Sequence, residues 1–374
     1  MGVGKSGMGP LDYARAACDT MMGRFAAAEL PPKGHFHYHQ GVFLSGMYRT
    51  YLLVKRQGQE GAGERYFDYI KKWVDSVIDE NGEIHWYDPG ELDDIQPGIL
   101  LFPLLERTGD PRYKKSLDTL LGHVWSFRRN EAGGFWHKNR CPNQMWLDGL
   151  YMAGPVSAEY GHRFGRPEFL DCAVEQALLM RKMTEDKNTG LWYHAWDCSK
   201  EAEWADPQTG LAPEFWGRSI GWVPVAVLDE LDFLPEEHPL YPDMCALVRD
   251  LLTAVCRWQS NEGRWYQVVD KGQQEGNWLE NSCSCLFVAA ICKAVRKGLL
   301  DESYLEKARA GYDGVIRSLT WEGEDLQIGN VCIGTGVGDY RHYCARPVSV
   351  NDLHGVGAFL IMCAEMGQEG GPEV

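Results

Sequence analysis

The stretch Gly133-Gly134-Phe135-Trp136-His137 is a turn followed by a short aromatic strand, and the chain repeats this pattern. Glycines at equivalent places, 82, 134, 190, 263 and 323, are 52, 56, 73 and 60 residues apart. Self-similarity at such a period is typical of repeat architectures. The pattern predicts that every repeat presents an aromatic loop at the same relative position. The other copies are Asn81-Gly82-Glu83-Ile84-His85-Trp86, Gly190-Leu191-Trp192-Tyr193-His194, Gly263-Arg264-Trp265-Tyr266 and, more faintly, Glu322-Gly323-Glu324-Asp325-Leu326.

Helical periodicity extends over twelve segments, which alternate between two kinds. One kind carries Lys, Arg, Asp and Glu on one face, as an outward-facing helix does, and the other is small and apolar nearly all round, as a buried helix is. Six outer and six inner helices predict an all-α fold, an (α/α)6 barrel or six-hairpin toroid. The segments are 11–27, 39–57, 63–79, 94–108, 112–128, 146–164, 167–183, 214–233, 241–260, 279–297, 302–318 and 350–366.

The end of the chain favours a closed ring over an open solenoid. An open array needs polar capping repeats at both ends, whereas the segment 350–366 is apolar throughout. No stretch rich in Pro, Ser or charge divides the chain. We therefore expect one catalytic domain over residues 1–374.

Composition excludes several classes of partner. The formal net charge of −16 opposes binding to nucleic acid or to an anionic membrane. No apolar run reaches transmembrane length, and the start of the chain lacks the apolar region of a signal peptide. Most of the 12 cysteines lie in helical apolar patterns, which predicts reduced thiols and a cytoplasmic protein.

The sequence predicts no cofactor and no metal. Cys283 and Cys285 form the tightest cysteine pair, but no second Cys or His pair accompanies them at zinc spacing. His137, His194 and His354 lie in or near equivalent loops, without the i, i+4 spacing of zinc hydrolases. We interpret these histidines as hydrogen-bonding groups for hydroxyls or a carboxylate.

Asp148 is the leading candidate for an acid, because it follows Met145 and Trp146 at the predicted start of an inner helix. Desolvation by such neighbours raises the pKa of a carboxyl group, and a second carboxylate such as Asp93 would raise it further. A general acid near neutral pH needs a raised pKa. The helix N-terminus has the opposite effect, and a capping role for Asp148 stays open.

Arg218 is flanked by aromatic residues in 215–222. Two interpretations stay open for it, an ion pair with an acidic residue or a fork that binds a substrate carboxylate.

These residues, in this order, resemble the unsaturated rhamnogalacturonyl hydrolases of glycoside hydrolase family 105. The resemblance covers nearly the whole chain, from 37–43 to 351–355. It implies an (α/α)6 barrel and a cytoplasmic, metal-free enzyme that removes a Δ4,5-unsaturated galacturonyl group from the non-reducing end of short pectin oligosaccharides. Its most specific stretches are Leu92-Asp93-Asp94-Ile95-Gln96, 133–138, 144–152, Tyr193-His194-Ala195-Trp196-Asp197, 215–222 and Asn277-Trp278-Leu279-Glu280.

The resemblance also implies residue roles. Asp148 is the implied general acid/base and Asp93 the second carboxylate. Tyr38 and His354, at the starts of other inner helices, are further substrate-binding candidates. The residues implied to line the subsite for the unsaturated sugar are His137, Trp146, His194, Arg218 and Trp222.

Two alternatives stay open. Unsaturated glucuronyl hydrolases share this barrel and act on glycosaminoglycan fragments, although the charge of −16 favours a neutral sugar such as rhamnose beyond the scissile bond. A non-catalytic oligosaccharide-binding protein is the other alternative, and a poised acid argues against it. We expect a monomer or a homodimer.

Overall fold

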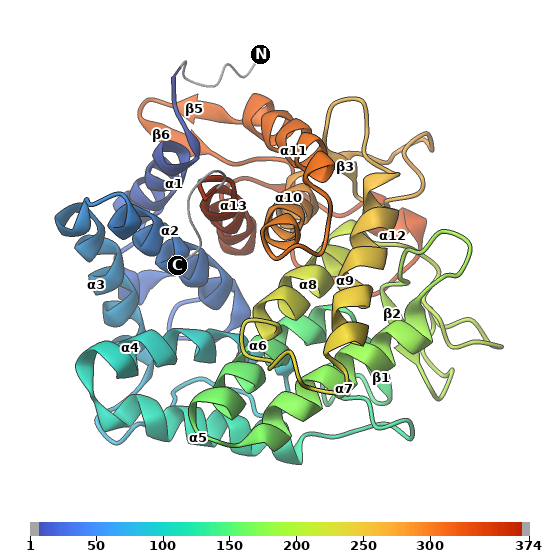
Figure 1. Ribbon diagram of the computed structural model, residues 1–374, viewed down its shortest axis with the longest axis horizontal. Helices are drawn as coiled ribbons and strands as arrows, with labels where there is room; N and C mark the ends of the chain where they lie inside the picture. Colours follow the sequence, from blue (N-terminus) through green and yellow to red (C-terminus); the bar gives the residue numbers. More distant parts are fainter. Residues whose placement is uncertain (1–6, 369–374) are drawn as a thin grey trace.

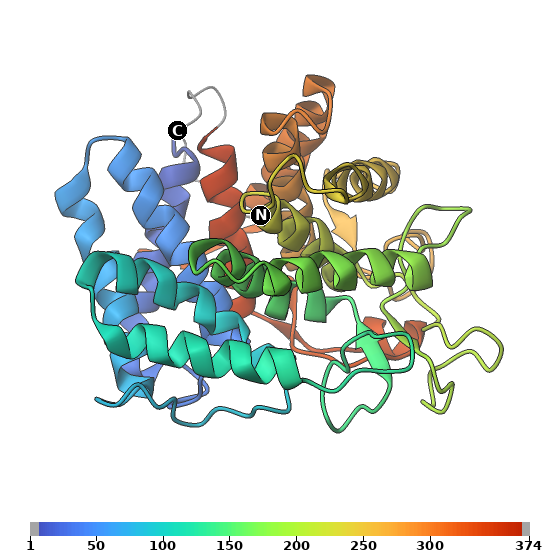
Figure 2. The same cartoon turned by 60° about the horizontal axis from the view of Figure 1, so that its bottom comes forward.

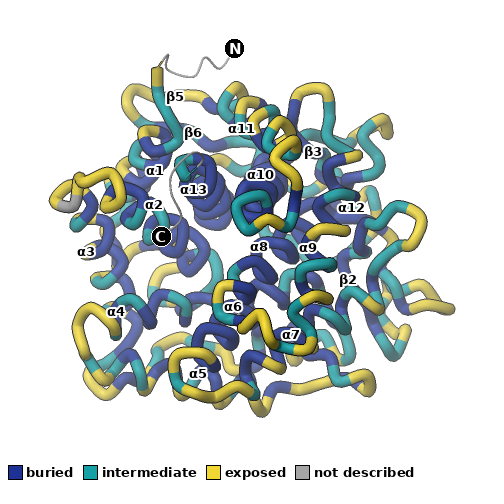
Figure 3. The backbone as a smooth tube through the Cα atoms, viewed as in Figure 1, coloured by how far each residue is buried: buried dark blue, intermediate teal, exposed yellow. Residues whose placement is uncertain are grey.

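The computed structural model describes residues 7–368 and places its long helices in two concentric layers (Figures 1 and 2). The inner layer is the more deeply buried of the two (Figure 3). The inner helices are α2 (Tyr38–Arg56), η3 with α4 (Gln96–Leu100 and Leu101–Thr108), α6 (Asp148–Arg163), α8 (Gly217–Glu230), α10 (Asn281–Arg296) and α13 (Leu353–Met366). The outer helices are α1 (Pro10–Arg24), α3 (Glu60–Val77), α5 (Pro111–Ser126), α7 (Pro167–Thr184), α9 (Tyr241–Cys256) and α11 (Leu305–Ser318).

The inner helices form a closed ring. Each packs on the next in chain order, and α13 packs on α2, so the last inner helix contacts the first. This confirms the predicted (α/α)6 barrel and excludes the open solenoid.

Two glycines allow the ring to close. A Cβ atom on Gly357 of α13 would lie 2.5 Å from the backbone carbonyl of Val42, and one on Gly46 of α2 would lie 2.8 Å from the carbonyl oxygen of Gly357. Helix backbones approach this closely only where side chains are absent. The small residues in the inner helices are therefore required by the packing.

The repeated turns lie at equivalent places, because each follows the end of an outer helix. The turn glycine is left-handed in all five copies, with φ of 78°, 89°, 75°, 88° and 64° at Gly82, Gly133, Gly190, Gly263 and Gly323. Glycine adopts this conformation without steric cost. Gly133, rather than its neighbour Gly134, is the turn residue of the second copy.

Eight short strands within the described residues pair as four two-stranded antiparallel sheets. The pair that joins two successive repeats is β1 with β2, in which Met145 lies opposite Trp196. The strands are β1 (Gln144–Trp146), β2 (Ala195–Asp197), β3 (Trp265–Tyr266), β4 (Leu279–Glu280), β5 (Thr320–Glu322), β6 (Asp325–Gln327), β7 (Val331–Cys332) and β8 (Val348–Ser349).

The structure differs from the sequence-based prediction in two segments. The segment predicted as one helix over 94–108 is divided into η2 (Leu92–Asp94), η3 and α4, with a proline in the first turn of η3. The short helix α12 (Tyr340–Cys344) was missed, because five residues are too few to show a period. No helix within residues 7–368 is long and apolar enough to cross a membrane.

We predict that Gly357→Ala destabilises the protein by about 2 kcal/mol, because the added methyl group clashes with the backbone of α2. Gly122→Ala is the matched control, since Gly122 is an exposed helical glycine in α5 with no atom within 4 Å of an added Cβ. The control should gain up to about 1 kcal/mol from helix propensity. Urea unfolding of both variants checks this, and equal stabilities would contradict the tight closure.

Candidate active site

The candidate residues lie together at one end of the ring, where the inner helices begin. Tyr38 begins α2, Asp148 begins α6, and Arg218 and His354 are the second residues of α8 and α13. Asp93 lies in η2, just before η3. Because the N-terminal end of a helix carries partial positive charge, helix starts that converge favour an anionic ligand even in an acidic protein.

Asp148 is held by a chain of hydrogen bonds. Its carboxylate lies 3.0 Å from His194 Nε2, and His194 Nδ1 lies 2.6 Å from the Tyr343 hydroxyl. The Tyr343 oxygen in turn accepts the backbone N–H of Gly338 at 3.1 Å. The consistent assignment has Tyr343 donating to Nδ1 and His194 donating from Nε2 to Asp148. Burial lowers the pKa of His194, which agrees with a neutral imidazole.

Opposing effects set the pKa of Asp148. Burial raises it, but the hydrogen bond from His194 and the positive potential of His137 and Arg218 outweigh burial, so the pKa lies below its ordinary value. The sequence left the direction of this shift open, and in the unliganded protein the lowering effects prevail. Asp148 rests as a carboxylate that only a change in its surroundings would protonate.

Asp93 is a firmly ionised carboxylate. It lies 3.3 Å from His137 Nε2 and forms an ion pair with Lys138, which also bonds Glu91 at 2.9 Å. Burial acts to raise the pKa of Asp93, but His137 and Lys138 hold it well below its usual range. Lys138 was not among the predicted site residues. The sequence signal for it is its position directly after a repeated aromatic loop.

Three aromatic rings connect the carboxylates of Asp93 and Asp148. His137 stacks on Trp146 with ring centroids 4.4 Å apart, and Trp146 meets His194 edge-on at 5.8 Å. A Cβ atom on Gly149 would lie only 3.2 Å from His137 Nδ1, so the start of α6 lies against His137. The structure thus brings together the predicted residues Asp93, His137, Trp146, Asp148 and His194.

The Arg218 side chain is buried near the start of α8. Its guanidinium donates to the carbonyl oxygens of Cys332 at 2.6 Å and Ile333 at 2.9 Å, and to the Ser282 hydroxyl at 3.4 Å. It also lies over the Trp216 ring at 4.4 Å. These bonds use three of its five N–H groups and leave Nε and one hydrogen of Nη2, which share an edge of the guanidinium.

Tyr38 lies half-buried among histidines. Its ring is 4.2 Å from that of His39 and 6.2 Å from that of His354. Burial, reinforced by the negative charge of Asp93, raises the pKa of Tyr38 and keeps the hydroxyl protonated. Burial lowers the pKa of His39 to about 3.

Two groups of side chains near Tyr38 have the donor atoms of a metal site. One is His39, Asp352 and His354, and the other is His37, Glu91 and Asp93.

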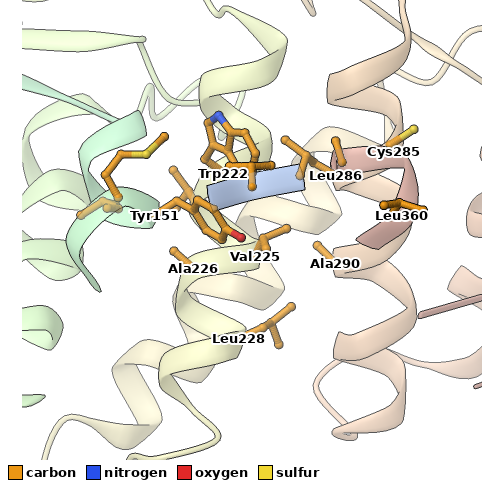
Figure 4. Close-up of a cluster of buried hydrophobic side chains, with 14 of the residues drawn as sticks. Tyr151, Trp222, Val225, Ala226, Leu228, Cys285, Leu286, Ala290 and Leu360 are labelled. Atoms are coloured by element: carbon orange, nitrogen blue, oxygen red, sulfur yellow. The ribbon is translucent and has the colours of Figure 1, made fainter. Parts of the chain in front are cut away.

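Trp222 lies in the apolar core rather than among the polar groups of the site. It is 1% exposed and stacks on Tyr151 with ring centroids 4.5 Å apart. Figure 4 shows it in the apolar cluster between inner helices, with Val225 and Leu286. Its contact with a substrate stays a prediction, which this degree of burial does not support.

A glycine-rich segment at 333–339 was missed by the sequence-based prediction, and it borders the site. A Cβ atom on Gly334 would lie 3.3 Å from the Tyr38 hydroxyl, and one on Gly336 would lie 3.7 Å from the Trp146 ring. Gly338 donates to Tyr343, as described above. The segment contains no aromatic or charged residue before Asp339, so no local pattern marked it.

A cavity of about 1010 Å³ lies at the other end of the ring. It is lined by residues from the C-terminal halves of the inner helices, including Arg49, Glu159 and Glu365. Arg49 pairs with Asp229 and Glu365, so these charges satisfy one another. The proposed catalytic carboxylates, Asp93 and Asp148, lie at the opposite end of the ring.

Comparison with known proteins agrees with this geometry. The sequence model of Glycosyl Hydrolase Family 88 matches residues 13–369. A solved glycoside hydrolase from family 105 of C. acetobutylicum ATCC 824 is 32% identical, with a TM-score of 0.88 over 95% of this chain and 99% of that one.

Two more distant relatives have names that specify a substrate. The unsaturated rhamnogalacturonyl hydrolase YesR of Bacillus subtilis (strain 168) is 26% identical over 280 residues, which cover 73% of this chain and 74% of YesR. The unsaturated glucuronyl hydrolase of Bacillus sp. GL1, responsible for the degradation of glycosaminoglycan, is 15% identical. Its TM-score is 0.70 over 97% of this chain and 96% of that one, a likeness of fold alone.

The family model covers most of the chain, and the family 105 structure, at 32% identity, matches 95% of it. The chain therefore belongs to Glycosyl Hydrolase Family 88 and is a glycosidase related to family 105, as the resemblance in its sequence predicted.

Proposed function

We propose that this glycosidase removes the Δ4,5-unsaturated galacturonyl residue from the non-reducing end of rhamnogalacturonan oligosaccharides by hydrating the C4=C5 double bond. The observation that carries the proposal is the partly buried Asp148 carboxylate, bonded to a neutral His194 beside Trp146 where inner helices begin. The name of YesR, a relative at 26% identity, supports the choice of sugar.

Asp148 supplies the proton. In the unliganded site it is ionised, but a bound uronate displaces water and brings a second negative charge, and both raise the pKa of a carboxyl group. Asp148 therefore gains a proton as the substrate binds. It gives this proton to C4, positive charge develops at C5 and the ring oxygen, and a water molecule adds to C5 and returns a proton to Asp148. The resulting hemiketal opens and releases the next sugar.

Asp93 acts electrostatically. Its pKa is held low by His137 and Lys138, so it stays negative throughout the cycle. A fixed negative charge near a developing oxocarbenium ion lowers the barrier without a proton transfer. The glycosidic oxygen needs no acid of its own in this route, unlike the two-carboxylate mechanism of ordinary glycosidases.

Arg218 is our candidate for the group that binds the uronate carboxylate. Its free Nε–H and Nη2–H lie on one edge, which suits a bidentate carboxylate. Tyr38, His137, Trp146 and His354 are proposed to border the sugar. We further propose one catalytic domain that works in the cytoplasm as a monomer or homodimer, and the twelve free cysteines support this compartment.

A panel of unsaturated disaccharides tests the proposed function. Loss of the ultraviolet absorbance of the C4=C5 bond should occur fastest with the rhamnogalacturonan disaccharide. Turnover only of chondroitin or heparin disaccharides would select the glycosaminoglycan alternative. Binding without turnover of any of them would select a non-catalytic protein.

We predict that Asp148→Asn lowers kcat by about three orders of magnitude, equivalent to about 4 kcal/mol of barrier, because the amide cannot donate the proton. Asp94→Asn is the control, since Asp94 is also a buried carboxyl near the site but accepts the backbone N–H of Asp88 at 2.8 Å. Its kcat should stay within about tenfold of wild type. Steady-state kinetics decide, and a tenth of wild-type activity in Asp148→Asn would remove Asp148 from the acid role.

We predict that Arg218→Lys raises KM by about one to two orders of magnitude, because lysine keeps the charge but loses the bidentate edge. The effect on kcat should be smaller if the carboxylate is bound equally in the ground and transition states.

An analogue with the carboxylate reduced to an alcohol is the control substrate. Wild type and Arg218→Lys should handle it almost equally. If the variant prefers the charged substrate by the wild-type margin, Arg218 serves only to hold the segment at 332–333.

A further inference from the structure

The ring closure brings together three metal-binding side chains from opposite ends of the chain. His39 lies in the first turn of α2, while Asp352 and His354 lie at the start of α13. One donor atom from each lies within 4.8 Å of the others. Neither proposed catalytic carboxylate belongs to this cluster.

The hydrogen bonds of His354 leave one ring nitrogen facing Asp352 alone. Its Nε2 lies 3.0 Å from the carbonyl oxygen of Cys332, so Nε2 carries a hydrogen. Its Nδ1 lies 2.7 Å from Asp352 Oδ1. The imidazole is fully buried. Either a proton or a bound cation therefore joins Nδ1 to the Asp352 carboxylate.

In His39, as in His354, one ring nitrogen donates a hydrogen bond and the other points to the cluster. His37 caps α2 by accepting the backbone N–H of His39 at its Nδ1, and His39 Nδ1 lies 3.0 Å from the same atom. His39 therefore donates from Nδ1 and keeps its lone pair on Nε2. A ligating histidine commonly donates its other N–H to a carbonyl or another acceptor, and both histidines do so here.

We propose that His39 Nε2, His354 Nδ1 and an Asp352 oxygen bind a divalent first-row transition-metal ion, for which Zn²⁺ is the representative. Two imidazoles and one carboxylate suit Zn²⁺ and its neighbours rather than Mg²⁺ or Ca²⁺, which prefer oxygen ligands. The ion links the first inner helix to the last. Three protein ligands also leave a coordination position unfilled.

The second group, His37, Glu91 and Asp93, is a poorer cation site. Lys138 pairs with both of its carboxylates, and Arg140 pairs with Glu91. These cations already occupy the carboxylate oxygens. The two groups share no residue, so substitutions can distinguish them.

A metal ion at this site differs from the metal-free protein that the sequence predicts, and the spacing of the ligands explains why. The ligand spacing is i, i+2 within 352–354, and the third ligand is more than three hundred positions away in the chain. Only the contact of α13 with α2 unites them.

Metal binding to the full-length, EDTA-treated protein tests the proposal. Titration with Zn²⁺ should show one saturable equivalent, and Zn²⁺ should raise Tm because an ion that binds only the closed ring stabilises it. Co²⁺ in its place should give visible d–d absorption without a thiolate charge-transfer band. This spectrum, taken on wild type, separates the site from the twelve cysteines.

His39→Ala and Asp352→Asn should each weaken Zn²⁺ binding by about 100-fold or more and abolish the rise in Tm. Glu91→Gln, in the other group, should bind as wild type does. Three results would overturn the proposal: no saturable equivalent, binding unchanged in both ligand variants, or a thiolate band with Co²⁺. Since the readout is binding and stability, the result is independent of whether the proposed glycosidase activity is correct.

Discussion

The close packing of α13 on α2 is the constraint on which the rest of the structure depends. Gly46 and Gly357 let the two backbones meet, and this contact turns a row of helical hairpins into a ring. Because the inner helices of the ring all begin at one end, their N-termini, which carry partial positive charge, converge on that end. An acidic protein thereby gains a local potential that suits an anionic sugar. The same contact sets His39 beside His354 and leaves the opposite end to a network of paired charges.

At this end of the ring, burial and hydrogen bonding shift the pKa of the Asp148 carboxyl group in opposite directions. Burial acts to raise the pKa of Asp148, but the hydrogen bond from His194, together with His137 and Arg218, lowers it below its ordinary value. Because the two effects oppose each other, a bound ligand that excludes water and adds negative charge can shift the balance. Asp93 has no such freedom, since Lys138 and His137 hold it ionised. Two carboxylates on neighbouring repeats thus differ in their capacity to carry a proton.

The sequence was sufficient to predict the architecture because the fold depends on periodic features. The turn glycines, the alternation of charged and apolar helices, and the positions of Asp93, Asp148 and His194 at loops and helix starts all follow the repeat. Tyr343 could not be identified in this way, because its role depends on its contact with His194, 149 positions away in the chain. Lys138 does follow a repeated loop, but its ion pair with Asp93 depends on how neighbouring repeats pack. The direction of the pKa shift of Asp148 could not be predicted from the sequence, since it depends on a hydrogen bond from a residue 46 positions away.

In the proposed reaction the C4=C5 double bond, rather than the glycosidic oxygen, receives the proton. Turnover in D₂O, followed by NMR on the earliest product, distinguishes the two routes. Deuterium should enter at C4, and the vinyl proton signal should disappear at the rate at which the second sugar is released. Release of the second sugar from a uronyl product that keeps its vinyl proton and carries no deuterium would contradict it.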